Sequence, residues 1–223
     1  MSINILYEDN SIIVVEKPAG VATQSADVRQ SDCVSYIKEH LKKNNPGNRE
    51  EPYVGVIHRL DQPVAGLLVF AKTKKAAASL SEQVRSDIMN KHYLAMVEGI
   101  IDAPEDTELI NYMYKDPQTS KAVITDEKSK APKLQEARLI YHTDRIIESR
   151  NCTILSVKLI TGRFHQIRAQ LSHIGHPITG DKKYGAKTPY EQGIALVADR
   201  LEFVHPDSGE KVEKSVDFSF SLC

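Results

Sequence analysis

Short apolar runs rich in β-branched residues recur along this 223-residue chain, but they do not alternate with helical segments at a regular spacing. Such runs predict strands, whereas a doubly wound parallel sheet would need a regular strand–helix alternation. The glycine-rich patterns GxGxxG and GxxxxGK[ST], which bind dinucleotides and nucleoside triphosphates, are absent from the sequence. We therefore expect an α+β fold with a mixed, largely antiparallel central sheet flanked by helices and loops.

Turn residues and apolar periodicity divide the chain into elements. Ser31 or Asp32 is placed to cap the first helix. Residues 102–133 contain three prolines and many charges, which predicts a loop-rich region. No repeat or linker marks a domain boundary, so residues 1–223 are predicted to form a single domain. The expected elements are a hairpin over 4–20, a helix over 31–44, a strand over 66–73, a helix over 74–89, a strand over 91–101, a strand, turn and helix over 153–177, and a hairpin over 201–218.

The three cysteines, Cys33, Cys152 and Cys223, are odd in number and far apart, and none has a second ligand at zinc spacing. We therefore expect no disulfide framework and no metal site. The N-terminal region has no basic stretch followed by an apolar core, and no eighteen apolar residues run together. These features favour a cytoplasmic protein without a membrane segment.

The formal net charge of −1 hides an uneven distribution of charge. Residues 151–190 contain six Lys or Arg residues and one acid, Asp181, whereas residues 191–223 contain three bases and seven acids. A locally basic segment suits an anionic ligand held at one face, although solvated lysines are the commoner explanation of such a count.

The sequence HRLD, His58 to Asp61, stands directly before an apolar strand. An aspartate at such a point is usually a turn or cap residue. Its functional alternative is a nucleophile or a base, which must stay ionised, and an arginine forked onto it would lower its pKa. Arg168 is a candidate for that arginine, but spacing alone does not bring it to Asp61.

Residues 164–174 predict a helix with one apolar face and one polar face. His165 and Arg168 lie on the polar face near the N-terminus, where free N–H groups and the helix dipole favour an anion such as phosphate. The alternative is an ordinary solvated surface. The apolar face consists of Ile167, Leu171 and Ile174, and the polar face also includes Ser172.

Three ordered motifs resemble those of the RluA family of RNA pseudouridine synthases: HRLD at 58–61, KHYLAMVEG at 91–99 and LITGRFHQIRAQLSHIGHPITGDKKYG at 159–185. The opening ILYEDNSIIVVEKPAG and the closing LVADRLEFVHP extend the resemblance to nearly the whole chain except residues 102–133. The resemblance implies the pseudouridine synthase fold and the isomerisation of uridine to pseudouridine in ribosomal or transfer RNA. It also implies that no metal, nucleotide or redox cofactor takes part.

The resemblance assigns three catalytic residues. Asp61 matches the catalytic aspartate, Tyr93 the tyrosine that lies against the target base, and Arg168 the arginine paired with the aspartate. Moving ribose from N1 to C5 of uracil requires a nucleophile and an apolar-walled pocket in which the freed base turns. Attack of Asp61 on the sugar and addition to the base both remain open.

Further residues are expected to bind the RNA. Arg59 matches an arginine implicated in displacing the target base, which must leave its stack before it reacts. Leu196 matches an apolar residue that lines the pocket. The full set expected to contact substrate is Arg59, His58, Leu196, Arg163 and His165.

The sequence also departs from the family pattern. Val64 and Ala65 stand where Thr and Ser usually precede Gly66, which removes two hydroxyls that could order the loop, and Val197 stands where His is common. The small N-terminal RNA-binding domain of the family is not found, so we expect recognition to rest on the catalytic domain, acting as a monomer without an obligate protein partner. The alternative function is a catalytically impaired RNA-binding protein on the same fold.

Two other motif matches indicate different classes of enzyme, and the rest of the sequence argues against both. HIGH, at residues 173–176, is a signature of class I aminoacyl-tRNA synthetases, but here it ends a helix and no KMSKS-like partner follows. A protein kinase would need a glycine-rich loop and a DFG motif, and the sequence has neither.

Overall fold

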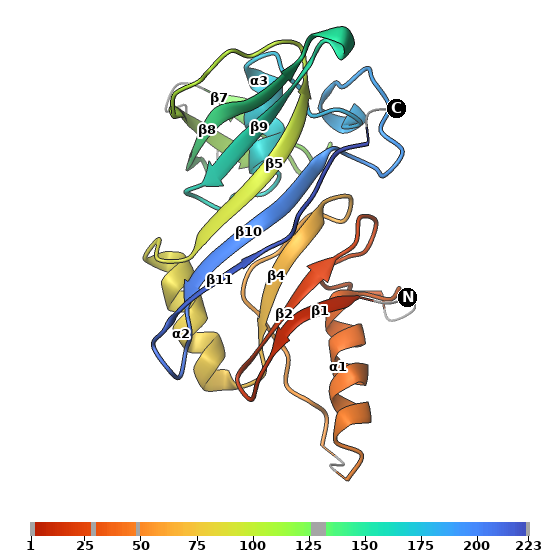
Figure 1. The fold of residues 1–223 in the computed structure, drawn as a ribbon, viewed down its shortest axis with the longest axis vertical. Helices are drawn as coiled ribbons and strands as arrows, with labels where there is room; N and C mark the ends of the chain where they lie inside the picture. The colour runs from red at the N-terminus through yellow and green to blue at the C-terminus, as the bar shows by residue number, and fades with distance from the viewer. Residues whose placement is uncertain (1–2, 28–29, 48–49, 126–132, 222–223) are drawn as a thin grey trace. The chain divides into compact units, whose positions relative to one another are not determined.

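The computed structural model describes residues 3–27, 30–47, 50–125 and 133–221. The chain forms two compact units. One consists of Met1–Met89 with Ala198–Asp217, and the other of Asn90–Val197 with Phe218–Cys223. The expected α+β class with a mixed sheet is confirmed, and the antiparallel pairings of each unit are given below (Figure 1). No helix in the described part of the chain has both the length and the apolar character needed to cross a membrane.

The first unit contains the expected N-terminal hairpin, whose second strand pairs with a central strand that enters from the HRLD segment. The hairpin strands are antiparallel, and residues 67–71 of the central strand are all buried, as is typical of a strand covered on both faces. The elements are β1 (Asn4–Glu8), β2 (Ile12–Lys17), α1 (Cys33–Asn44), β3 (Gly55–Val56), β4 (Ala65–Ala71), α2 (Lys74–Arg85), most of β10 (Leu196–Val204) and β11 (Lys211–Ser215).

Both helices of this unit begin where a side chain caps them. Asp32 accepts a hydrogen bond from the Ser35 N–H of α1 at 2.7 Å, which confirms the expected cap, and Thr73 accepts one from the Ala76 N–H of α2 at 3.1 Å. One face of β4 packs with α2 and β10 in a core that includes Leu67, Val69, Ala71, Ala76, Leu80, Leu201 and Phe203.

The second unit is an antiparallel sheet in the order β5-β9-β8-β6-β7, with one helix against it. Ala169 of that helix packs on Met113, Ala122 and Ala137 of the sheet. The elements are β5 (Asn90–Glu98), β6 (Thr107–Lys115), β7 (Ala122–Thr125), β8 (Gln135–Ile147), β9 (Cys152–Leu159), α3 (Gln166–His173) and the 3₁₀ turns η1 (Glu148–Arg150) and η2 (Lys182–Tyr184).

The expectation that residues 102–133 are loop-rich is wrong where the structure describes them, because β6 and β7 occupy much of that range; residues 126–132 lie outside the described part. In β6 the more buried positions alternate with less buried ones, but one of the buried positions is the polar Asn111 and one of the exposed positions is the apolar Ile110. The apolar–polar alternation that predicts a half-buried strand is therefore reversed at its centre.

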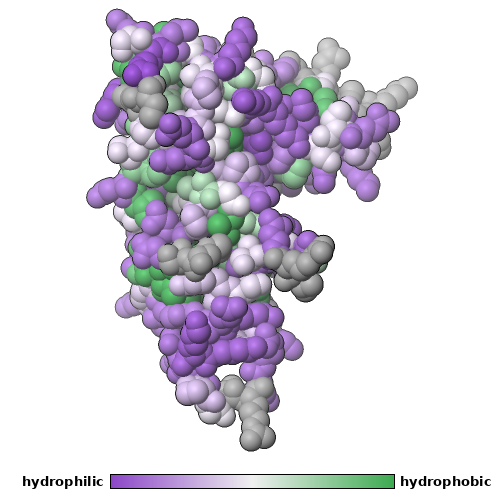
Figure 2. All heavy atoms as spheres, turned by 90° about the vertical axis from the view of Figure 1, so that its right-hand side faces the viewer, coloured by the Kyte–Doolittle hydropathy of each residue, from purple (hydrophilic) through white to green (hydrophobic). Residues whose placement is uncertain are grey.

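Apolar atoms reach the surface in small areas between hydrophilic side chains on the face shown in Figure 2. Among the described residues, the large hydrophobic side chains that remain exposed are scattered along the sequence: Tyr53, Ile88, Ile100, Ile110 and Phe164. Scattered exposure of this kind is normal in globular proteins.

Gly66, at the start of β4, gives the first prediction. Its φ of +119° suits glycine, and an added Cβ would collide with the backbone of Ala198. We expect Gly66→Ala to lower the free energy of unfolding by about 3 kcal/mol, because backbone strain and overpacking act together. Urea unfolding followed by circular dichroism measures the loss.

Gly209→Ala is the matched control. Gly209 also has a positive φ, +73°, but an added Cβ there would meet nothing within 4 Å. Strain alone should cost roughly 1 kcal/mol. Equal losses for the two variants would show that the collision with Ala198 contributes nothing.

Candidate active site

Asp61 lies in the loop between β3 and β4, and the protein fixes the residues on both sides of it. Leu60 is held by Thr23, whose hydroxyl donates to the Leu60 carbonyl at 3.0 Å and accepts from its N–H at 3.1 Å. Gln62 exchanges hydrogen bonds with the backbone of Gly20 at 2.8 and 2.9 Å. Asp61 itself is half-buried, so its carboxylate stands on a loop anchored at two neighbouring points.

Beneath this loop lies Lys17, the last residue of β2, which is completely buried. Its ammonium group donates to three backbone carbonyls, those of Pro18 at 3.0 Å, Val21 at 2.7 Å and Gln62 at 3.1 Å. Burial lowers the pKa of Lys17 to about 8, while attraction to Cys33 and, less strongly, to Asp61 acts in the opposite direction. A buried positive charge therefore both fastens the Asp61 loop and interacts with the carboxylate that the loop carries.

The two residues that open the HRLD motif differ in exposure. Arg59 is exposed. His58 is half-buried, and its Nε2 accepts a long hydrogen bond, 3.4 Å, from the Val69 N–H of β4. Val69 thus ties His58 to the strand.

In the second unit, Arg168 of α3 is buried and paired with Asp181. Its Nε donates to one carboxylate oxygen at 2.6 Å and one terminal nitrogen donates to the other at 2.9 Å, a bidentate arrangement with side chains 6% and 1% exposed. The one acid of the basic segment is therefore the partner of its buried arginine. Because Asp61 belongs to the other unit, the pairing of Arg168 with Asp61 stays a prediction.

A series of buried amides places α3 and with it Arg168. The Gln166 amide donates to the Arg138 carbonyl at 3.0 Å and to the Gln170 side chain at 2.9 Å, and Gln170 donates to the Asn111 side chain of β6 at 2.8 Å. The explanation of the polar face as a solvated surface is wrong, because Arg168 is buried and the half-buried His165 and Ser172 both bond to Tyr184. The polar groups of α3 bond to the protein.

His165, the residue before α3, adopts a left-handed backbone conformation with φ of 53°. Its Nδ1 lies 2.8 Å from the Tyr184 hydroxyl, and that hydroxyl oxygen accepts the Ala122 N–H at 2.7 Å. The Tyr184 proton is thus available to His165. Phe164 stacks on the His165 ring at 3.7 Å and is partly exposed, with the Lys115 ammonium 4.6 Å from its centroid.

The remaining expected residues of the second unit occupy different environments. Tyr93 is 5% exposed and shares its face of β5 with Ala95 and Val97, as the alternation predicts. Leu196 is buried at the start of β10. Arg163 is half-buried, and its Nε donates to the Glu136 carbonyl at 2.9 Å.

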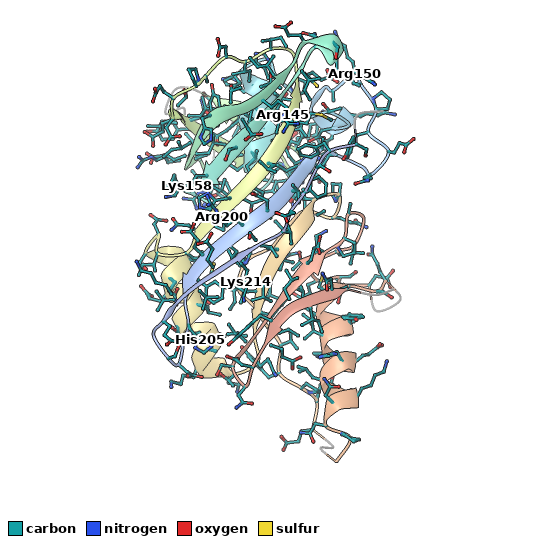
Figure 3. All side chains as sticks on the ribbon, viewed as in Figure 1. Arg145, Arg150, Lys158, Arg200, His205 and Lys214 are labelled. Carbon is teal, nitrogen blue, oxygen red and sulfur yellow. The ribbon has the colours of Figure 1, made fainter. Side chains whose placement is uncertain are left out.

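With Arg168 buried against Asp181, the other five bases of the segment 151–190 all remain partly or fully exposed. One of them, Lys158, extends from β9 (Figure 3). The others are Arg163, Lys182, Lys183 and Lys187. The exposed charge of this segment is therefore wholly positive, as an anion-binding face requires.

Residues 11–173 match the family model described as RNA pseudouridylate synthase. The chain belongs to this family. Among curated relatives, a ribosomal large subunit pseudouridine synthase D of Nitrosomonas europaea is 34% identical over 93% of this chain and 60% of its own length. An uncharacterized RNA pseudouridine synthase of Aquifex aeolicus is also 34% identical, over 93% of this chain and 67% of its own. The chain thus spans about three fifths to two thirds of these pseudouridine synthases.

Solved structures give the same fold. Human RNA pseudouridylate synthase domain containing 1 superposes with a TM-score of 0.75 at 22% identity, over 97% of this chain and 84% of its own. Human RNA pseudouridylate synthase domain containing 4 superposes with a TM-score of 0.74 at 22% identity, over 97% and 88%. The expected pseudouridine synthase fold is confirmed.

Sequence reasoning missed Lys17, Thr23 and Asp181, which support the candidate site. Lys17 closely follows the apolar run Ile12–Val15 and directly precedes Pro18, so its position at the end of a buried run was the available signal. Asp181 was visible as the one acid among six bases of the segment. Thr23 left no signal, because its value depends on a contact with Leu60, 37 positions away.

Lys17 gives a prediction about pH. Its pKa is about 8 in the folded protein and near its ordinary value of 10.5 in the unfolded chain, so between these values the unfolded chain binds more protons. Stability from this group therefore rises with pH across that window. We expect the stability of the wild type, relative to Lys17→Met, to increase by about 3 kcal/mol from pH 8 to 10.5 in urea unfolding.

Cys33 requires a control, because burial raises the pKa of its thiol to about 11 and the Lys17 charge opposes that shift. Both proteins should therefore also be compared in a Cys33→Ala background. A stability difference that stays flat or falls with rising pH in that background would contradict the buried, charged Lys17.

Proposed function

We propose that this chain converts a specific uridine in RNA to pseudouridine, with Asp61 as the nucleophile and without metal, nucleotide or redox cofactor. The observation that carries the proposal is the Asp61 loop: a half-buried carboxylate whose flanking residues, Leu60 and Gln62, are fixed by the protein above a buried ammonium group. A residue that serves only as a turn does not need such bracing, whereas a nucleophile must be held in one place.

Arg168 is proposed to orient Asp61. A guanidinium group carries five N–H donors in a fixed plane, and Asp181 engages one edge of it through Nε and one terminal nitrogen. A guanidinium group can bind a second carboxylate through the donors of another edge. Asp181 would then fix the arginine, and the arginine would fix the nucleophile.

Two residues are proposed to handle the base and the RNA around it. Tyr93 is held by its burial in β5 and would form one wall of the pocket in which the detached uracil turns. Arg59, which is exposed, would occupy the space that the flipped uridine leaves in the RNA stack. His58, Leu196, Arg163 and His165 are proposed to support substrate binding around them.

The proposed substrate is a uridine in the RNA of the large ribosomal subunit, because a curated relative is named as a ribosomal large subunit pseudouridine synthase. Transfer RNA is the second candidate. The partly exposed ring of Phe164, stacked on His165 beside Lys115, is typical of a surface on which an unpaired base stacks. We further propose that the protein acts in the cytoplasm as a monomer.

The alternative is an RNA-binding protein that has lost turnover, and the replacement of the usual Thr-Ser by Val64 and Ala65 motivates it. The geometry of the loop favours the enzyme. Val64 is buried and its N–H donates to the Asp61 carbonyl at 3.0 Å, so the turn closes without a hydroxyl. Lys17, Thr23 and Gln62 order the rest of the loop.

The experiment that tests this function measures tritium. Since C5 of uracil loses its hydrogen when it bonds to the sugar, RNA labelled with tritium at C5 of uridine should release label to water with this protein alone. Asp61→Asn keeps the size of the side chain but removes the attacking charge, so release should fall on the order of a thousandfold or more while RNA binding survives. A folded Asp61→Asn protein with near-normal release would eliminate Asp61 as nucleophile.

Arg168 extends this test through a double-mutant cycle. Arg168→Met alone leaves the Asp181 carboxylate buried without its guanidinium, which destabilises by roughly 3–5 kcal/mol, so the Arg168→Met/Asp181→Asn variant is the better starting protein. If Arg168 acts through Asp61, adding Asp61→Asn to this variant should cost far less release than it costs in the wild type. Fully additive losses would show that Arg168 acts independently of Asp61.

The exposed bases predict how RNA affinity depends on salt. Neutralised phosphates release counterions, so replacing Lys182, Lys183 and Lys187 together by Gln should reduce the slope of log affinity against log salt by about two. Filter binding at several salt concentrations measures the slope.

The control removes the same charge elsewhere, through Lys43, Lys74 and Lys75 replaced together by Gln; all three are exposed in the first unit. That triple variant should keep the wild-type slope. Equal changes in both triple variants would attribute the effect to net charge rather than to contacts at residues 182–187.

A further inference from the structure

The second unit contains a cavity of about 450 Å³ that the proposed reaction does not use. It opens on the face of β5 that carries Met96 and Glu98, whereas Tyr93, Ala95 and Val97 point to the opposite face, because side chains alternate along a strand. Its volume lies in the range of small-molecule sites. The cavity and the Tyr93 side chain therefore lie on opposite faces of β5.

Two polar atoms in the wall of this cavity have no hydrogen-bond partner in the described part of the protein. They are the Thr179 hydroxyl and the Tyr190 hydroxyl, and both atoms are buried. Thr179 as a whole is only 4% exposed. Buried hydroxyls are nearly always hydrogen-bonded, because burial without a partner costs free energy, so these two atoms can each accept or donate a hydrogen bond to a polar ligand in the cavity.

The wall around the two hydroxyls is built to stay in place. The Thr179 N–H donates to the Met96 carbonyl at 2.9 Å, and the Thr179 carbonyl accepts from Ala195 at 2.9 Å. The Glu98 carboxylate accepts two backbone N–H groups, from Lys187 at 2.8 Å and Thr188 at 2.5 Å. A pre-formed pocket of this kind loses little entropy when a ligand enters.

The remaining lining favours a flat, uncharged ring. Met96 and Cys152 present soft sulfur atoms, and the Tyr190 ring is held edge-on against Phe220, with centroids 6.2 Å apart. Arg150, at the η1 turn between β8 and β9, is the one basic residue of the lining (Figure 3). Two carboxylates, Glu98 and Glu191, outnumber that single positive charge and disfavour a phosphorylated ligand.

We propose that this cavity binds a neutral nucleobase, either in a free nucleoside or in an unpaired nucleotide of RNA. The ring lies in the apolar part of the cavity, and its ring nitrogens and exocyclic groups bond to Thr179 and Tyr190, since each hydroxyl both donates and accepts. The inference goes beyond the proposed isomerase function and does not depend on it.

Isothermal titration of the protein with adenosine, guanosine, cytidine, uridine and their 5′-monophosphates tests this site. At least one nucleoside should bind with one-to-one stoichiometry, and its monophosphate should bind more weakly. Thr179→Val and Tyr190→Phe each remove one hydroxyl and should weaken that nucleoside roughly three- to tenfold. No binding of any nucleoside at millimolar concentration, or equal binding by the wild type and both variants, overturns the proposal.

Stability distinguishes a ligand-binding hydroxyl from a structural one. Thr153 is the matched control: it is also buried, but its hydroxyl donates to the Gly99 carbonyl and accepts from the Ile101 N–H, both at 3.0 Å. In urea, Thr153→Val should lower the unfolding midpoint, whereas Thr179→Val should leave it unchanged or raise it. A loss for Thr179→Val as large as that for Thr153→Val would overturn the assignment of the Thr179 hydroxyl to a ligand.

RNA binding distinguishes the two sources of the base. If RNA supplies it, Thr179→Val and Tyr190→Phe should weaken RNA in filter binding by the same factor as the nucleoside. If a free nucleoside supplies it, RNA affinity should stay at the wild-type value while nucleoside affinity falls. Tritium release reports on the isomerase reaction and titration with nucleosides reports on the cavity, so failure of nucleoside binding and failure of the isomerase proposal are separate results.

Discussion

The buried ammonium group of Lys17 is the interaction on which the candidate site depends. Three carbonyls from two separate segments, those of Pro18, Val21 and Gln62, converge on one cation, so the turn after β2 and the loop before β4 are tied at a single point. An apolar side chain in place of Lys17 would leave the three buried carbonyls without their donor. The cost of burying the charge appears in the lowered pKa of Lys17, and its product is a fixed Asp61 loop.

In the second unit, too, a buried charged group fixes a segment of the candidate site, but here it is paired with an opposite charge. Arg168 sits on a helix whose polar face is buried, and the helix keeps its place through a bidentate bond to Asp181 and through amides that reach β6. A buried charge pair is weak evidence for stability, because desolvation offsets the attraction. The Arg168–Asp181 pair instead fixes the position and orientation of the guanidinium group.

The sequence predicted those structural features that depend on neighbouring residues and missed those that depend on contacts between distant ones. The hairpin of β1 and β2, the Asp32 cap and the burial of β4 all follow from neighbouring residues, and all are confirmed. The strand β6 was missed because Asn111 occupies a buried position, where a long-range bond from Gln170 satisfies it. The same distance effect hid Thr23 and left open whether the polar face of α3 is solvated, since a sequence pattern does not show which partner will bury a polar side chain.

The departure at Val64 and Ala65 shows why the candidate site required the structure. From the sequence, Val64 and Ala65 remove two hydroxyls that could order the loop, because side-chain hydrogen bonds are a usual means of ordering a turn. In the structure, Val64 is buried and Gly66 passes the Ala198 backbone at a distance that suits only glycine, so packing fixes the chain where hydrogen bonding was expected. Lys17 and Thr23 brace the other side of Asp61. The position of the carboxylate is therefore maintained by contacts from outside the HRLD motif, and the motif can vary next to Asp61 without releasing it.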